Sequence, residues 1–197
     1  MTAELVFRVA LAIVSLAVAI IRAYYGRLAI QSGGKVSFKR ASRVRTVLIW
    51  LVGVTATSAS SLYVVLPEWM AWAALPLAVV LRWLGVGLGI LTVLLFWWVH
   101  RTLGKNWSMP GEIKEMQDLI TDGPYRWVRH PMYSTLFVWT PAYFLMSANW
   151  FIGFAWLALG LLSAMMVKDE EASLIEKFGE AYRAYMKRTG RFLPRIG

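Results

Sequence analysis

Cysteine is absent from this 197-residue sequence, and charged residues make up only 16% of it. Without cysteine the chain can form no disulfide bond and use no thiolate chemistry, while its redox compartment stays open. The low charge accompanies 58% hydrophobic residues, whereas a soluble domain has about 25% charged and about 45–50% apolar residues. The composition therefore predicts a membrane protein, folded as a single integral membrane domain over residues 1–197.

Signatures of several enzyme classes are missing as well. The sequence has only two histidines and no cluster of His or Cys at metal-ligand spacing, so we expect no metal site. It has no glycine-rich phosphate-binding loop and no arrangement of a nucleophile with its base. Chemistry that relies on these devices is therefore not expected.

Long apolar stretches are abundant, and they define the fold class. A membrane-spanning helix needs about 20 mostly apolar residues, and five stretches reach or approach this length, at 5–22, 46–66, 82–100, 132–147 and 150–167. The link between the last two is so short that they must form an antiparallel helical hairpin. We therefore expect an all-α, polytopic membrane protein with about five transmembrane helices.

The first stretch has an alternative interpretation as a cleavable signal peptide. Residues 5–22 lack a basic region before the apolar run, and no convincing small-residue cleavage site follows it. A signal peptide typically has both a basic region before the apolar run and a small-residue cleavage site after it. We therefore expect a helix that is retained in the protein.

Basic residues predict the orientation in the membrane. The segment after the first stretch contains seven of them and no acid, namely Arg22, Arg27, Lys35, Lys39, Arg40, Arg43 and Arg45. By the positive-inside rule this segment is cytoplasmic. Alternation then places the N-terminus outside, and the 101–131 connection and the C-terminal tail in the cytoplasm. Topology and attraction to anionic lipids explain most of the net charge of +10, so we expect no nucleic-acid partner.

The C-terminal tail has its own helical pattern. Apolar residues recur at three- and four-residue spacing between Leu174 and Met186, which predicts an amphipathic helix over 169–189 that ends at Gly190. Such a helix can simply lie on the bilayer surface. We expect it instead to form a cytoplasmic cofactor pocket, together with the 101–131 connection and the helical hairpin.

The stretch "GPYRWVRHPMY", residues 123–133, stands at the start of the fourth apolar run. Pro131 suits the first turn of a helix, and it biases His130 toward an extended conformation. The amide groups at such a helix start can receive an anionic group. Arg129 and Tyr133 border the same place, so the stretch predicts an anion-binding wall.

Acidic residues face this wall from the other half of the hairpin. Asp169, Glu170 and Glu171 follow the fifth stretch directly, where the helix dipole and the anionic membrane both disfavour negative charge. These acids need a cation, which nearby Lys or Arg side chains of the tail can supply. The alternative is a bound ligand that carries both charges.

Two motifs together carry a resemblance to a known family. "GPYRWVRHPMY" and the later "KDEEASLIEKFGEAYRAYMKRTGRFLP" resemble the isoprenylcysteine carboxyl methyltransferases and their wider relatives, which include membrane phospholipid methyltransferases. The resemblance runs from "LGKNWS" at 103–108 through Pro194. An RHPxY-like element also occurs in membrane sterol reductases, where the pocket takes a nicotinamide cofactor. The adjacent Glu170 and Glu171 favour methyl transfer.

The resemblance implies S-adenosylmethionine as cofactor and a lipophilic acceptor that enters from the bilayer, most simply the carboxylate of an isoprenylcysteine. It implies that the cofactor is held in a pocket open to the cytoplasm by Tyr125, His130, Pro131, Tyr133, Glu170 and Glu171. Arg129 and Arg191 are the candidates for placing the acceptor carboxylate, because guanidinium offers two parallel donors. Asn106 and Trp107 are expected to line the approach of the acceptor.

Three alternatives stay open at this point. An amine acceptor, as in phospholipid N-methylation, would require a base, because only a neutral amine attacks. An NADPH-dependent reductase of the sterol reductase type would bind a nicotinamide cofactor, and a non-enzymatic membrane scaffold would bind neither ligand. Membrane lipids are expected neighbours in every case, and nothing in the sequence indicates the oligomeric state.

Overall fold

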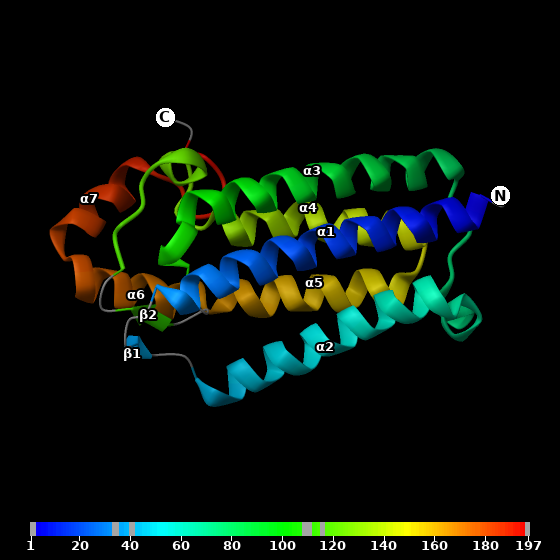
Figure 1. Ribbon diagram of the computed structural model, residues 1–197, viewed down its shortest axis with the longest axis horizontal. Helices are drawn as coiled ribbons and strands as arrows, with labels where there is room; N and C mark the ends of the chain where they lie inside the picture. The colour runs from blue at the N-terminus through cyan, green and yellow to red at the C-terminus, as the bar shows by residue number, and fades with distance from the viewer. Residues whose placement is uncertain (1–2, 33–35, 40–41, 108–111, 115–116, 196–197) are drawn as a thin grey trace.

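The computed structural model describes residues 3–32, 36–39, 42–107, 112–114 and 117–195. Five long helices run along its longest axis, as Figure 1 shows. They are α1 (Ala3–Gln31), α2 (Arg43–Val65), α3 (Val79–Leu103), α4 (Pro131–Ser147) and α5 (Trp150–Met165). The predicted all-α fold is confirmed, with one small addition: β1 (Val36–Lys39) pairs antiparallel with β2 (Glu112–Lys114).

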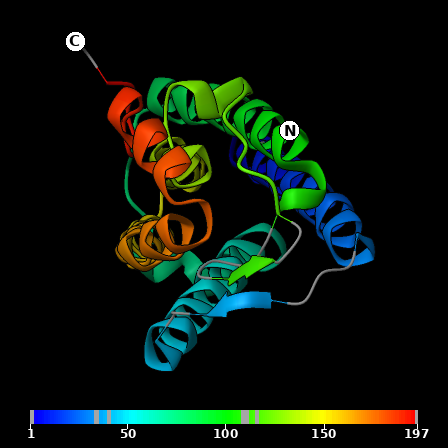
Figure 2. The same ribbon diagram turned by 90° about the vertical axis from the view of Figure 1, so that its left-hand side faces the viewer.

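Shorter elements connect and cap the long helices. Three of them are 3-10 helices, η1 (Pro67–Ala73), η2 (Gly104–Asn106) and η3 (Gly123–Arg126), and the last two are α6 (Val167–Phe178) and α7 (Glu180–Arg188). In Figures 1 and 2, α6 and α7 cover one end of the bundle, while α1 begins at the opposite end. The tail therefore forms a layer across one end of the long helices.

Four segments within the described residues are long and apolar enough to cross a membrane, namely Ala3–Gln31, Arg43–Val65, Val79–Asn106 and Trp150–Phe178. The fifth predicted stretch corresponds to α4, which has 17 residues and packs against α1, α3 and α5. Large apolar side chains point outward, for example Ile13 and Leu16, each 62% exposed. Because an apolar outer surface suits lipid and not water, the chain is an integral membrane protein.

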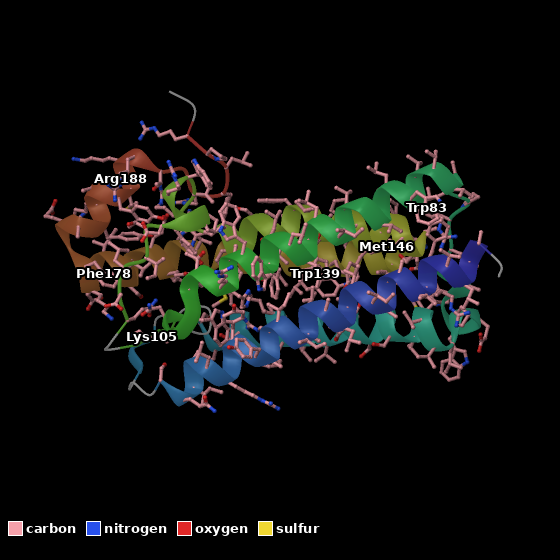
Figure 3. The ribbon with its side chains drawn as sticks, turned by 45° about the horizontal axis from the view of Figure 1, so that its top comes forward. Trp83, Lys105, Trp139, Met146, Phe178 and Arg188 are labelled. Atoms are coloured by element: carbon pink, nitrogen blue, oxygen red, sulfur yellow. The ribbon has the colours of Figure 1, made fainter. Side chains whose placement is uncertain are left out.

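The core lies between the helices and is rich in aromatic rings. Trp139 lies near the middle of the bundle in Figure 3, with ring centroids 4.8 Å from Trp156 and 5.6 Å from Phe96. Each of these rings buries a large apolar area. Other buried members of the same cluster are Leu11, Val14, Val18, Ala56, Tyr63, Tyr143, Met146 and Ile152.

The hairpin between α4 and α5 turns on two residues. Ala148 adopts the left-handed conformation with φ of 46°, and Asn149 caps α5 by accepting a hydrogen bond from the amide of Ile152 at 3.1 Å. The Asn149 side chain also donates to the carbonyl of Met70 at 2.9 Å, which ties the turn to η1. The predicted hairpin is thus confirmed, and the start of α4 and the end of α5 lie at the same end of the bundle.

The tail helix predicted over 169–189 is two helices in the structure. Gly179 separates α6 from α7 with φ of 54°, and its amide closes α6 by donating to the carbonyl of Ile175 at 2.8 Å. A positive φ carries little cost in glycine. The apolar spacing continues across the glycine, and for this reason the pattern alone did not reveal the bend.

Helices α3 and α4 approach each other very closely at Gly85. A methyl group on Gly85 would lie 2.7 Å from Leu145 Cβ and 2.7 Å from the Met146 nitrogen. Neither a Cβ atom nor a backbone nitrogen can move without shifting α4 itself. The α3–α4 contact therefore requires glycine at this position.

We expect Gly85→Ala to destabilise the protein by about 1–3 kcal/mol, the usual range for overpacking. At roughly 2–4 °C per kcal/mol, the melting temperature in detergent should fall by several degrees. Gly87→Ala is the matched control, because a methyl group there has no neighbour within 4 Å. Equal melting temperatures for the two variants would contradict the close α3–α4 contact.

Candidate active site

The acids at 169–171 belong to the start of a new helix. The chain turns at Met166, whose amide donates to the carbonyl of Ser163, and α6 begins at Val167. Asp169 and Glu170 therefore lie in the first turn of α6. The expectation that they stand at an unfavourable helix end is wrong, because the partial positive charge of a helix N-terminus stabilises acids.

Glu171 is buried between two arginines, and we call this group the arginine clamp. Its Oε1 lies 2.9 Å from Arg129 Nε, and its Oε2 lies 2.5 Å from Arg191 Nη2. Arg129 also donates to the backbone carbonyls of Met186 and Thr189. Only 4% of Glu171 is exposed, so its charge depends on these partners.

The arginine clamp changes the roles predicted for Arg129 and Arg191. Both were expected to receive the carboxylate of the acceptor, but in the structure both bind the carboxylate of Glu171. A buried carboxylate has first claim on nearby guanidinium groups, since leaving it unpaired is costly. The two arginines therefore attach the tail to α4.

Backbone hydrogen bonds reinforce this attachment. The amides of Arg129 and His130 donate to the carbonyls of Gly190 and Arg191, at 2.9 and 3.1 Å. Gly190 returns a hydrogen bond to the carbonyl of Trp127 at 3.2 Å, and Ser134 Oγ donates to the carbonyl of Phe192 at 2.6 Å. The His130 amide, which was predicted to bind an anion, therefore already donates a hydrogen bond to the tail.

Glu170 binds Tyr133 and lies close to His130. Tyr133 donates its hydroxyl hydrogen to Glu170 Oε2 at 3.0 Å, and His130 Nδ1 lies 3.7 Å from Glu170 Oε1. His130 Nε2 lies 3.4 Å from Glu171 Oε1 without hydrogen-bond geometry, and it is buried with no partner. His130 therefore keeps unused hydrogen-bonding capacity.

A polar cavity, lined by charged, amide and tyrosine side chains, opens beside these residues. It is the space between the end of the bundle and the α6–α7 layer, where Lys105, Phe178 and Arg188 are labelled in Figure 3. Seven of the ten predicted site residues line it: Asn106, Trp107, Tyr125, Arg129, His130, Tyr133 and Glu170. Pro131, Glu171 and Arg191 are not among the lining residues.

The cavity also contains residues that the sequence interpretation did not assign to a site. They include Arg22 from α1, Asp118 from the connection before η3, and Tyr182 and Tyr185 from α7. The Asp118 amide donates to Asn106 Oδ1 at 2.9 Å, and the Tyr182 hydroxyl is buried without a partner. Their patterns offered little signal, because Arg22 belongs to a basic run and the two tyrosines belong to an apolar helix face.

Burial sets the protonation state of the cavity tyrosines outside the membrane helices. It raises the pKa of Tyr125 and Tyr182 well above the ordinary value and raises the pKa of Tyr185 to about 12. The phenolate form is disfavoured because the site has little water to solvate the charge. These three hydroxyls are therefore neutral hydrogen-bonding groups and poor bases.

A second, apolar cavity lies between the membrane helices. Its walls include Leu136, Trp139 and Trp156, of which Trp139 is labelled in Figure 3. Three residues line both cavities, namely Arg22, Met132 and Tyr133. The first turn of α4 and the last third of α1 thus form the boundary between a polar space and an apolar one.

Fold and site together define a class of protein. It is an integral membrane protein whose polar cavity, at one end of a helical bundle, adjoins an apolar cavity between the helices. The model of the phospholipid methyltransferase family matches residues 80–181, slightly more than half of the chain. The chain belongs to this family.

Curated relatives are similar over the C-terminal half. The protein-S-isoprenylcysteine O-methyltransferase of Dictyostelium discoideum is 33% identical over 99 residues, covering 48% of this chain and 41% of the relative. The enzyme of the same name from Homo sapiens is 35% identical over 98 residues, covering 48% and 34%. The match therefore spans less than half the length of these relatives.

A solved structure of a eukaryotic intramembrane Ras methyltransferase, isoprenylcysteine carboxyl methyltransferase, also matches this chain. The alignment covers 78% of this chain and 52% of that one, with 24% identity and a TM-score of 0.47.

We expect Glu171→Gln to lower stability by roughly 2–4 kcal/mol, because Arg129 is left buried without a counter-charge. Its side chain is only 8% exposed. The detergent melting temperature should fall, and protease should cleave the tail faster than in the unchanged protein. Glu180→Gln is the control, since Glu180 pairs with Arg183 at 3.1 Å but its side chain is 91% exposed. If both variants behave alike, the arginine clamp does not hold the tail.

Proposed function

We infer that the chain is an S-adenosylmethionine-dependent methyltransferase that acts at the membrane interface on a lipophilic acceptor, most simply the carboxylate of an isoprenylcysteine. The observation that carries this proposal is the meeting of the polar and apolar cavities at Met132 and Tyr133. A charged cofactor and an apolar acceptor can reach one point only where such cavities join. Membership in the phospholipid methyltransferase family supports methyl transfer, and the names of the relatives support the acceptor.

The residues of the polar cavity fit S-adenosylmethionine. Glu170 suits the ammonium group or the ribose diol, while His130 Nε2 and the Tyr182 hydroxyl are buried polar atoms in need of partners. The ring of Tyr125 can contact the adenine ring or the sulfonium cation.

The other predicted cofactor residues have supporting roles in this proposal. Pro131 fixes the first turn of α4 and thereby the direction of Tyr133. Glu171 holds Arg129 and Arg191 in place, and through them the tail that closes the cavity. Asn106 orders the connection at Asp118, beside the expected approach of the acceptor.

The chemistry asks the protein mainly for alignment and exclusion of water. When bound, S-adenosylmethionine supplies an activated methyl carbon, to which a carboxylate oxygen forms a bond as the bond to sulfur breaks and its electron pair stays on the resulting neutral thioether. No proton moves, so no base is needed. Tyr133 and Glu170 hold the donor side, and the apolar walls around Leu136 and Trp139 hold the acceptor chain in line.

A carboxylate acceptor suits this site better than an amine. An amine must lose a proton before or during transfer, and the raised pKa values of Tyr125, Tyr182 and Tyr185 make them poor bases. Glu171 is held by two arginines and is equally unsuited. The amine acceptor of a phospholipid methyltransferase is therefore the second candidate.

The proposed orientation places the cofactor cavity in the cytoplasm. The end of α1, the start of α2 and the α6–α7 layer lie at the same end of the bundle, opposite the start of α1 (Figure 1). By the positive-inside rule this end is cytoplasmic and the N-terminus lies outside. Membrane lipids surround the apolar outer surface, and the acceptor enters from them.

We expect S-adenosylhomocysteine to raise the melting temperature of the purified protein, because a ligand that binds only the folded state stabilises it. NADPH is the control ligand and should have no effect. Glu170→Gln and Tyr133→Phe should weaken the affinity for S-adenosylhomocysteine by about 10-fold, the effect of losing one hydrogen bond to a charged group. Glu180→Gln should leave it unchanged.

Two results would overturn the proposed function. A shift with NADPH alone would identify a reductase pocket, and no shift with either ligand would favour a scaffold. If S-adenosylhomocysteine binds, transfer of a labelled methyl group to an S-prenylated cysteine analogue, compared with phosphatidylethanolamine, then separates the carboxylate acceptor from the amine.

A further inference from the structure

Arg22 is unusual among the arginines of the site. It belongs to α1, and its guanidinium carbon lies 3.9 Å from the centre of the Trp107 ring. It lines both the polar and the apolar cavity. Within the described part of the chain, no hydrogen bond or ion pair joins Arg22 to another residue.

Four other arginines, by contrast, are paired with acids of the chain. Arg129 and Arg191 bind Glu171, Arg82 binds Glu4 at 2.6 Å, and Arg45 binds Asp169 at 2.7 Å. These guanidinium groups are neutralised by acids of the protein itself. Arg22 has only an aromatic face, which stabilises a cation but does not neutralise it.

A half-buried cation between a polar and an apolar space favours an anion from outside the chain. Stacking on Trp107 fixes the guanidinium plane and leaves its edge available for two parallel hydrogen bonds. The best match for such an edge is a carboxylate or a phosphate. The neighbouring apolar cavity adds a second requirement, a hydrocarbon chain attached to the anion.

The apolar cavity also indicates the size of this chain. Tyr133 at its mouth and Tyr143 at its inner end both lie on α4, about 15 Å apart at the usual rise of 1.5 Å per residue. The inner end is aromatic, formed by Trp139, Tyr143 and Trp156. Four of its polar atoms are already paired, Ser15 Oγ with the Tyr143 hydroxyl at 2.8 Å and Trp156 Nε1 with Ser60 Oγ at 3.1 Å.

We propose that Arg22 binds the carboxylate of the methyl acceptor and places it at the junction of the two cavities, while the apolar chain of the acceptor fills the cavity below. This inference rests on the proposed function and assigns to Arg22 the role that the sequence predicted for Arg129 and Arg191. Arg22 is a substrate-positioning residue that sets specificity for an acid. The group that it neutralises is the one that receives the methyl group.

Two other anions are chemically possible at Arg22. One is the carboxylate of the cofactor, and the other is a lipid phosphate. The position of Arg22 favours the acceptor over the cofactor, because Glu170 and His130 line only the polar cavity whereas Arg22 also lines the apolar one. A lipid phosphate is disfavoured because Arg22 lies against the ring of Trp107, which is buried inside the protein.

The first test measures binding and needs no turnover. An S-prenylated cysteine analogue is compared with its carboxamide, using thermal shifts of the protein without cofactor. In the unchanged protein the carboxylate should bind about 10-fold or more tightly than the carboxamide. Arg22→Gln should abolish this preference, and Arg22→Lys should keep part of it. Because the preference is a ratio within one variant, a loss of overall stability does not obscure it.

Arg27→Gln is the matched control, since Arg27 lies on the same helix and is exposed. It should keep the full preference for the carboxylate. S-adenosylhomocysteine should bind the Arg22 variants as tightly as it binds the unchanged protein. In turnover with a prenylcysteine acceptor, Arg22→Gln should raise KM for the acceptor about 10-fold or more and leave KM for the cofactor unchanged.

Three outcomes would overturn the role of Arg22. A carboxylate preference that persists in Arg22→Gln, or one that is absent from the unchanged protein, would show that Arg22 does not hold the acceptor. A parallel loss of S-adenosylhomocysteine affinity would assign Arg22 to the cofactor. Failure of the proposed function itself is separate, because it appears as a lack of S-adenosylhomocysteine binding in the unchanged protein.

Discussion

The buried carboxylate of Glu171 is the interaction on which the site depends. Arg129 reaches it from the start of α4, and Arg191 reaches it from the segment after α7. Each partner satisfies a charge that would otherwise be costly to bury. With the backbone pairing of 127–130 and 190–191, this ion pair network turns the tail into a wall. The polar cavity exists because that wall stands across the end of the bundle.

The membrane gives the site its second boundary. Below the first turn of α4 the walls become apolar, and the same turn carries Tyr133, which binds Glu170 in the polar space. In the proposed function, reactants of opposite solubility can therefore approach one short stretch of backbone from two sides. The protein does not need to move either reactant out of the medium that dissolves it. Positioning and exclusion of water then account for most of what the residues must do.

The fold was largely predictable, because apolar runs of membrane length have few alternative structures. The hairpin followed from the short link at Asn149, and the pairing of the "RHP" stretch with the acids followed from the hairpin. The partners of Glu171 did not follow, since Arg191 lies 20 residues away and returns only because α7 bends back at Gly179. The place of Arg22 in the cavities was not predicted for a different reason. Sequence periodicity cannot distinguish an arginine that only sets the orientation in the membrane from one that faces a cavity.

The distance along the chain between the parts of the tail attachment has a consequence for folding. Arg129 and Glu171 are 42 residues apart, and Ser134 binds the carbonyl of a residue 58 positions away. Contacts of this range close late, since the loop between them must be ordered first. Insertion of the apolar helices does not require them. We therefore expect biogenesis to have two separable stages, so that a lesion in the tail would yield a protein that reaches the membrane with its helices in place but without the wall that closes the polar cavity.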